Sequence, residues 1–573
     1  MTNIKHSNSN AKTSKPVKDE YVSSAIPLSS QFHLQWWLCF SFITVLAFAT
    51  RFYKIAEPNH VCWDETHFGK MASWYINHTF FFDVHPPLGK MLIAFAGHLT
   101  GYNGTFAFNK PGDSYGDYPI LGMRIFCAAL GTMIVPCSFV IVWNLSRSLA
   151  ASIMASTLLL FGMVFFIENS FEIFFFAVVD ETDIGMIILS QYILLDPVLM
   201  CFIICSTMGM TMFHSYGDRS FQTPWWFWLG WTGFFLACAM SVKFVGLFVV
   251  LLVGIFTIND LWNIYGDLNN SIPLVMKHFL ARVLCLIVIP IIVYMTFFWC
   301  HLTILNQSGS GDGFYSSAFQ STLKGNSLYN ASMPQFVAYG ATVTIKNHRT
   351  GGAYLHSHWH LYPEGVGARQ QQVTTYSHKD DNNKWRVKKY NEESAENAEP
   401  IEYVRNGDLI RLEHVVTERN LHSHNEMAPI TKKHFQVTCY GEKGVGDAND
   451  VFRIEFETGD TKQRLEAVKT RFKLVHYLMN CAIHSHNKQL PKWAFEQLEV
   501  TCTPNVFDTK NTLWNVEDNH FARLPNVSVE VYAPTFFDKF FESHAVMLQG
   551  NSGLKPKEGE ITSRPWQWPI NYR

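Results

Sequence analysis

The chain has 573 residues and a formal net charge of −2, and 48% of its residues are hydrophobic. The near-neutral charge argues against nucleic acid as a partner. Long apolar runs fill the first 300 residues, whereas residues 301–573 carry the dispersed charge of a water-exposed domain. This composition predicts a membrane protein with one large soluble domain.

The first half contains enough apolar sequence for several membrane-spanning helices. A span needs about 20 largely apolar residues, and by this criterion we predict seven, over residues 32–50, 121–144, 149–168, 185–213, 225–242, 244–259 and 280–300. We separate the fifth from the sixth by a turn at Ser241-Val242-Lys243. Residues 1–31 form a polar tail whose lysines favour the cytosol.

Seven spans place the loop 51–120 and everything after residue 300 together on the far side of the membrane. Sequons are consistent with this orientation. Five of them would face the lumen, at Asn77, Asn103, Asn306, Asn330 and Asn526, whereas Asn144 and Asn269 would not.

The first lumenal loop concentrates charge at one membrane edge. Asp64 and Glu65 lie in Trp63–Gly69, and Asp83 is followed by the sequence His85 to Lys90. Acidic residues near lipid are costly unless they face water or a site, so this loop is where a membrane enzyme would handle a polar head group on a lipid. The alternative is that Asp64 and Glu65 only cap a helix beginning near Thr66.

The soluble half contains a threefold repeat over residues 334–520. Its marker is His-Ser-His, at 356–358, 422–424 and 484–486, and an aromatic residue follows 29 or 30 residues after each first histidine. The first histidines are 66 and 62 residues apart. Three units of this length with short β-rich runs predict a pseudo-threefold β-trefoil.

The His-Ser-His copies could hold a metal or fix a turn. The copies recur once per unit with no nearby carboxylate or cysteine in the sequence to complete a ligand set, so we favour the structural role and assign no metal ligands. Binding of carbohydrate or of an acceptor is a secondary hypothesis for the trefoil.

Several longer motifs together resemble the protein O-mannosyltransferase family over residues 30–573. These are Asp64-Glu65, His85 to Lys90, Ile193 to Pro197, Ser241 to Phe248, Ser308 to Asp312, and three MIR units that match the repeat. The resemblance implies a GT-C-like multi-pass membrane domain over residues 32–300, a lumenal linker over 301–333 and a lumenal MIR β-trefoil over 334–520.

The resemblance also implies a reaction in the endoplasmic reticulum membrane. Mannose would pass from dolichyl phosphate mannose to Ser or Thr hydroxyls of lumenal proteins, with inversion by a single displacement. Asp64 would be the base, Glu65 would position the acceptor or a cation, and Asp83 would help to hold the acceptor peptide. Arg51 and Arg124 would stabilise the leaving phosphate.

The family implies a heterodimer with a protein O-mannosyltransferase 1-like subunit and no certain cofactor beyond the lipid-linked donor, although a divalent cation is compatible. Two departures affect this reading. Residues 521–573 resemble the approach to further spans that this chain does not contain, and residues 168–183 resemble an insertion. A non-catalytic or truncated partner subunit is therefore the alternative function.

Overall fold

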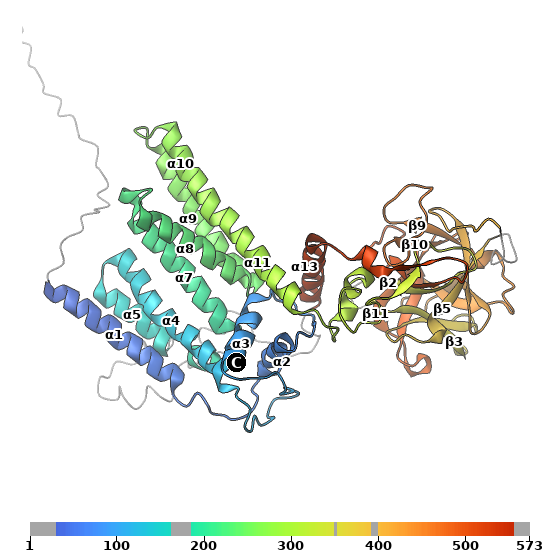
Figure 1. The fold of residues 1–573 in the computed structure, drawn as a ribbon, viewed down its shortest axis with the longest axis horizontal. Helices are drawn as coiled ribbons and strands as arrows, with labels where there is room; N and C mark the ends of the chain where they lie inside the picture. Colours follow the sequence, from blue (N-terminus) through green and yellow to red (C-terminus); the bar gives the residue numbers. More distant parts are fainter. Residues whose placement is uncertain (1–29, 162–184, 349–351, 391–398, 555–573) are drawn as a thin grey trace, which may run out of the picture.

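The computed structural model describes residues 30–161, 185–348, 352–390 and 399–554. Its helices and strands form two bodies, which are joined by a linker and by the last helix, α13 (Phe536–Gly553) (Figure 1). The predicted tail 1–31 falls almost entirely outside the described residues. The predicted insertion 168–183 and the chain after residue 554 lie outside them as well.

Five described helices are long and apolar enough to cross a membrane. They are α1 (Ser30–Phe52), α4 (Leu121–Ser146), α7 (Asp196–Ser215), α9 (Leu247–Gly266, with the turn before it) and the continuous helix formed by α10 (Ile272–Val283), a π turn (Leu284–Val288) and α11 (Ile289–Ile304). Two more apolar helices occupy predicted spans, α5 (Leu149–Phe161) and α8 (Thr223–Met240). The multi-pass helical architecture predicted from the sequence is confirmed.

The predicted span 185–213 is wrong as a single helix. It is divided into α6 (Gly185–Gln191) and α7 by an irregular segment at residues 192–195. The break has a long-range cause, because the backbone N–H of Ile193 donates to the carboxylate of Glu65 instead of continuing a helix. Pro197 then begins α7 at a position where its missing N–H costs nothing.

The last predicted span, 280–300, is part of a helix that extends from Ile272 to Ile304. Its π turn precedes Pro290, which cannot donate a backbone hydrogen bond. Helix α8 packs closely here: a Cβ on Gly233 would lie 1.8 Å from the carbonyl oxygen of Cys285. Only glycine therefore allows α8 to approach the π turn.

The loop 51–120 contains two short helices, α2 (Glu65–Ile76) and α3 (Leu88–Leu99). Helix α3 is absent from the sequence-based prediction. Its amide at Leu88 donates to the carbonyl of Ser241 in the turn between α8 and α9, at 2.9 Å. This contact places the His-Pro-Pro segment against that turn.

The predicted β-trefoil is confirmed by the strand pairing. Six strands form a closed ring in which each pairs with the next in chain order and the last pairs with the first. They are β2 (Thr342–Asn347), β5 (Lys384–Lys389), β6 (Leu409–His414), β9 (Phe452–Phe456), β10 (Arg471–His476) and β13 (Trp514–His520). The other six strands of this 12-stranded sheet form three hairpins: β3 (Tyr354–Leu361) with β4 (Gln371–Tyr376), β7 (Arg419–Met427) with β8 (Phe435–Tyr440) and β11 (Ala482–Gln489) with β12 (Leu498–Thr503). The three hairpins also pair with one another.

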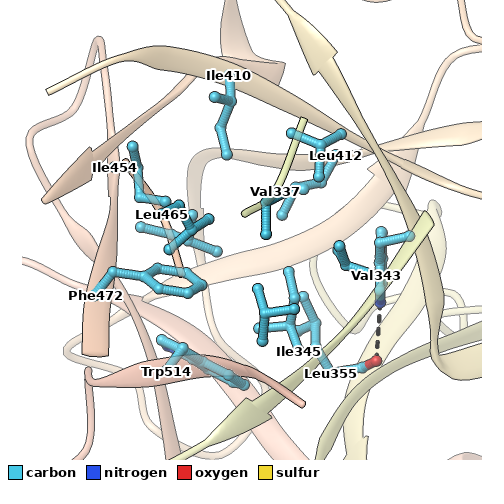
Figure 2. Packing of buried hydrophobic residues seen from close by; sticks show 14 of the residues in the cluster. Val337, Val343, Ile345, Leu355, Ile410, Leu412, Ile454, Leu465, Phe472 and Trp514 are labelled. Atoms are coloured by element: carbon cyan, nitrogen blue, oxygen red, sulfur yellow. Dashed lines mark hydrogen bonds between the residues drawn. The ribbon is translucent and has the colours of Figure 1, made fainter. Parts of the chain in front are cut away.

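One apolar core fills this barrel, and all three repeats contribute to it (Figure 2). The repeated aromatic positions, Trp385, Phe452 and Trp514, are fully buried. The two tryptophans also donate equivalent hydrogen bonds at 2.9 Å, from Trp385 to the carbonyl of Leu355 and from Trp514 to that of Ile483. A single repeat could not enclose these side chains.

The first histidine of each His-Ser-His motif is buried and bonds within its own repeat. The Nδ1 of His356 lies 2.8 Å from Asn383 and that of His422 lies 2.7 Å from Asp450, each at the end of a short 3-10 turn. The structural role predicted for the motif therefore holds in these two repeats. His422, Asp447 and Asp450 lie close enough together to hold an ion, but Asp450 already accepts the backbone N–H of Asp447 in a capping box.

We expect Trp514→Ala to destabilise the trefoil by about 3–5 kcal/mol, because the change leaves a cavity in a closed core and removes a buried hydrogen bond. Trp359→Ala is the matched control, since 62% of the Trp359 side chain is exposed on the same domain. Thermal unfolding of the detergent-solubilised protein measures both. Equal melting temperatures for the two variants would contradict the placement of Trp514 in the core.

Candidate active site

The side chain of Glu65 is the most heavily hydrogen-bonded group of the loop 51–120. It is fully buried at the first position of α2. Arg124, at the start of α4, donates to it through Nε at 2.9 Å and Nη2 at 2.8 Å. The hydroxyl of Tyr115 and the backbone N–H groups of Cys62 and Ile193 also donate to it, at 2.9, 2.9 and 3.1 Å.

Arg124 is equally enclosed, with 2% of its surface exposed. Its remaining donors reach the carbonyls of Pro58, at 2.9 Å, and His60, at 3.2 Å. All three guanidinium nitrogens therefore donate to acceptors of the chain itself. An ion pair this deeply buried is stable only when the charged groups have a full set of hydrogen-bond partners. Here both the Glu65 carboxylate and the Arg124 guanidinium have them.

Asp64 differs from its neighbour in being exposed. It is the residue that precedes α2, but its side chain makes no capping hydrogen bond. Trp63, with a φ of 41°, is also exposed and packs edge-on against Tyr192, with 5.5 Å between ring centroids. The capping alternative thus has no side-chain hydrogen bond from Asp64 to support it.

The second acidic cluster is organised around a buried ion pair between Asp83 and Lys90. Lys90 is 1% exposed and also donates to the carbonyl of His85, at 2.7 Å. Burial lowers the pKa of Lys90, and the neighbouring Asp83 carboxylate opposes that shift. The ammonium of Lys90 therefore fixes the Asp83 carboxylate and the His-Pro-Pro segment together.

A small pocket adjoins this ion pair and is lined by residues from four parts of the chain. They include Asp83, His85 and Lys90 from the loop, His301 from α11, Tyr315 from the linker and Ser543 from α13. Burial lowers the pKa of His85 and raises that of Tyr315. Both side chains are thus held neutral near pH 7.

Lys243 and Asp196 form a further ion pair at this end of the helices, with 2.8 Å between Nζ and Oδ1. Lys243 lies in the turn between α8 and α9, and Asp196 begins α7. The pair is incompletely buried, with 16% and 41% of the two side chains exposed. Both charges act on His85, so this pair lies near the loop cluster. From the sequence we predict a turn at Lys243 and assign neither residue to the site.

Arg51 lies elsewhere, at the end of α1, and is 1% exposed. Its guanidinium donates to the carbonyl of Leu159 in α5, at 3.2 Å, and to the hydroxyl of Thr50, at 3.0 Å. Among the hydrogen bonds and ion pairs of the described residues, none joins Arg51 to Asp64, Glu65 or Arg124. The structure therefore brings together Asp64, Glu65 and Arg124, but it does not join Arg51 to them.

Two family models match the chain. One is the dolichyl-phosphate-mannose-protein mannosyltransferase model, over residues 41–172 and 174–306, and the other is the MIR domain model, over residues 353–516. These matches cover the helical body and the trefoil separately.

Relatives of high identity extend over nearly the whole chain. Protein O-mannosyl-transferase 2 of Drosophila melanogaster is 56% identical over 98% of this chain and 70% of its own length. The protein of the same name from Danio rerio is 54% identical over 93% of this chain and 67% of its own length.

A solved structure supports the same relationship. The Saccharomyces cerevisiae protein O-mannosyltransferase Pmt1-Pmt2 complex, bound to its sugar donor, contains a chain with a TM-score of 0.81 and 34% identity, over 93% of this chain and 70% of that one. Membrane fold, trefoil and sequence agree, and the chain belongs to the dolichyl-phosphate-mannose-protein mannosyltransferase family.

Proposed function

We propose that this chain transfers mannose from dolichyl phosphate mannose to Ser and Thr hydroxyls of proteins, with Asp64 as the general base. Membership of the mannosyltransferase family supports the reaction. The exposure of Asp64 is the observation that carries the assignment, because a base must reach the acceptor hydroxyl. Glu65, one residue along, is buried and saturated with donors.

The reaction requires one displacement. The acceptor oxygen forms a bond to C1 of mannose while the bond from C1 to the phosphate oxygen breaks, and the bonding pair leaves with dolichyl phosphate. The hydroxyl proton passes to the carboxylate of Asp64. Attack on the face opposite to the leaving group inverts the configuration at C1 and needs a single base on the acceptor side.

We infer that Glu65 and Arg124 act on the reaction by positioning. Their ion pair fixes the segment before α2, which carries Asp64, against α4 and residue 193. Direct binding of the leaving phosphate by Arg124 or Arg51 would require either side chain to exchange an internal acceptor for a phosphate oxygen. Asp83, held by Lys90, is proposed to contact the acceptor peptide.

Lys243 is our candidate for the cation that receives the leaving phosphate. It has the one partner Asp196 among the described ion pairs and remains partly exposed. An ammonium beside a departing phosphate stabilises the negative charge that develops as the bond breaks. Exchange of Asp196 for a phosphate oxygen would leave the folded core intact.

We propose the endoplasmic reticulum lumen as the side that holds the site and the trefoil. The disulfide between Cys481 and Cys502 supports this placement, since disulfides persist in oxidising compartments. Helices α2 and α3 lie at the end of the helical body nearest the trefoil (Figure 1). The sequons at Asn103, Asn330 and Asn526 are exposed.

A second subunit of the same family is the partner that the comparisons favour, because the matched yeast structure is a complex of two such proteins. We propose a heterodimer with a protein O-mannosyltransferase 1-like subunit. The alternative, a non-catalytic subunit, would leave transfer by such a pair independent of Asp64.

Replacement of Asp64 by Asn should abolish mannosyl transfer to a Ser/Thr-rich peptide, because the amide cannot accept the hydroxyl proton. The assay uses microsomes that contain the partner subunit, and immunoblotting confirms equal protein levels. Asp117→Asn is the matched control, as Asp117 is another exposed carboxylate of the same loop. Full activity of Asp64→Asn would refute the base assignment and favour the non-catalytic alternative.

Glu65→Gln should destabilise the fold by about 3–5 kcal/mol, since it leaves the buried guanidinium of Arg124 without a counter-ion. Scanning fluorimetry of purified protein measures the effect. Glu57→Gln, which breaks an exposed pair with Lys54, should change stability by less than about 1 kcal/mol. The double variant Glu65→Gln/Arg124→Met should recover part of the loss; a purely additive loss would contradict the pairing.

Lys243→Met should lower kcat by about 100-fold or more, the scale expected when a group that stabilises transition-state charge is removed. The melting temperature should change little, because the pair with Asp196 is partly exposed. Lys243→Arg should retain part of the activity, and Lys277→Met removes an exposed lysine of α10 as a control. An unchanged kcat for Lys243→Met would remove Lys243 from the site.

A further inference from the structure

A groove lies between the trefoil and helix α13, away from the residues described so far. Four segments line it: the linker, the trefoil, the turn before α13 and α13 itself. Its lining includes Ser316, Arg471, Asn515, Val531, Phe541 and Glu542.

Helix α13 separates this groove from the candidate active site. Asp538, Phe541, Glu542 and Ala545 line the groove, and at 100° per residue they occupy one face of the helix. The opposite face contacts the catalytic loop, through Ser543 and Met547 in the Asp83 pocket, and through Asn551, which donates to the carbonyl of Val84 at 2.7 Å.

The contact between α13 and the loop that carries Phe82 and Val84 is close. A Cβ on Gly550 would lie 2.7 Å from the ring of Phe82 and 2.9 Å from Val84. His544 further ties α13 to Tyr294 of α11, at 2.8 Å. The groove and the acidic loop are thus two sides of one firmly held helix.

The charges in the groove are largely satisfied by the chain itself. Lys469 lies 3.6 Å from Glu466, Asp538 caps its own helix, and Glu542 accepts two hydrogen bonds from Ser316. The groove therefore has no surplus of one sign that would select a phosphate or a cation. A neutral ligand fits this lining better.

Two large apolar side chains in the groove are exposed, Val531 at 68% and Phe541 at 66%. They lie among polar side chains of the trefoil such as Gln335 and Lys469, whose side chain is 65% exposed. Apolar anchors beside polar groups match an extended polypeptide, which offers side chains to pack and backbone amides to bond.

We propose that this groove binds an extended segment of the acceptor polypeptide, at a distance from the Ser or Thr that receives mannose. This proposal rests on the proposed function, because it takes the protein acceptor as given. The groove then acts as a secondary site: it raises affinity for long, unfolded acceptors and leaves the chemical step at Asp64 unchanged.

The test compares two acceptors in microsomes that contain the partner subunit. One is a peptide of about 6 residues with a single Thr, and the other has about 30 residues, which extended span up to about 100 Å. Phe541→Asp places an unpaired carboxylate beside Asp538 and Glu542. We expect KM for the long acceptor to rise about tenfold, with kcat for it and both constants for the short peptide unchanged.

Phe537→Asp is the matched control, because Phe537 lies one turn earlier on α13, is 56% exposed and does not line the groove. It should leave both acceptors unaffected. The proposal is overturned if Phe541→Asp changes the short and long acceptors equally, if it changes neither, or if Phe537→Asp gives the same result.

A second measurement does not depend on catalysis. Benzoylphenylalanine in place of Phe541 should crosslink the long peptide on irradiation without donor, whereas the same group in place of Phe537 should not. If transfer is absent altogether, the proposed function fails, and this crosslink still tests the groove. Crosslinking to the partner subunit instead of the peptide would overturn the proposal.

Discussion

The carboxylate of Glu65 joins three segments that are far apart in the sequence, and the end of the helical body that carries α2 and α3 depends on it. It accepts hydrogen bonds from the loop before α2, from Arg124 at the start of α4 and from the backbone of Ile193, where a helix is interrupted. Burying a carboxylate is costly, and only a full set of donors makes the buried charge tolerable. Loss of any one segment would therefore weaken the position of the other two.

Two further carboxylates, Glu517 and Glu542, set the position of the trefoil. Ser317 of the linker donates to Glu517 of β13 at 2.8 Å, while the preceding Ser316 donates to Glu542 of α13. Glu517 also pairs with Lys346 of β2, at 3.0 Å. Burial raises the pKa of Glu542, and the lysines near Glu517 lower its pKa. Two adjacent serines thus connect the trefoil to the helix that contacts the loop carrying Asp83 and Val84.

The sequence predicts best what is periodic or local. The spacing of His356, His422 and His484 was sufficient to predict the trefoil, because each repeat must place the same buried groups in the same closed core. The turn at Lys243 was also predictable, since a charged residue interrupts a long apolar run. The break at Ile193 was not, because its cause is Glu65, 128 residues away. The groove beside α13 could not be predicted from the sequence either, because its lining comes from four separate segments that no single sequence pattern connects.

Two adjacent acidic residues in one motif acquire different roles from their surroundings. The same argument applies to the basic residues Arg124 and Lys243. Asp64 and Glu65 are chemically similar, but Asp64 is exposed and open to an acceptor, whereas five hydrogen-bond donors occupy the carboxylate of Glu65. Arg124 would have to give up buried partners to bind a phosphate, at the cost of leaving Glu65 unpaired. Lys243 and Asp196 are partly hydrated, and an ion pair in water is worth little. The lysine can therefore exchange its carboxylate for a phosphate at small cost, and this difference favours Lys243 over the arginines as the group that meets the leaving dolichyl phosphate.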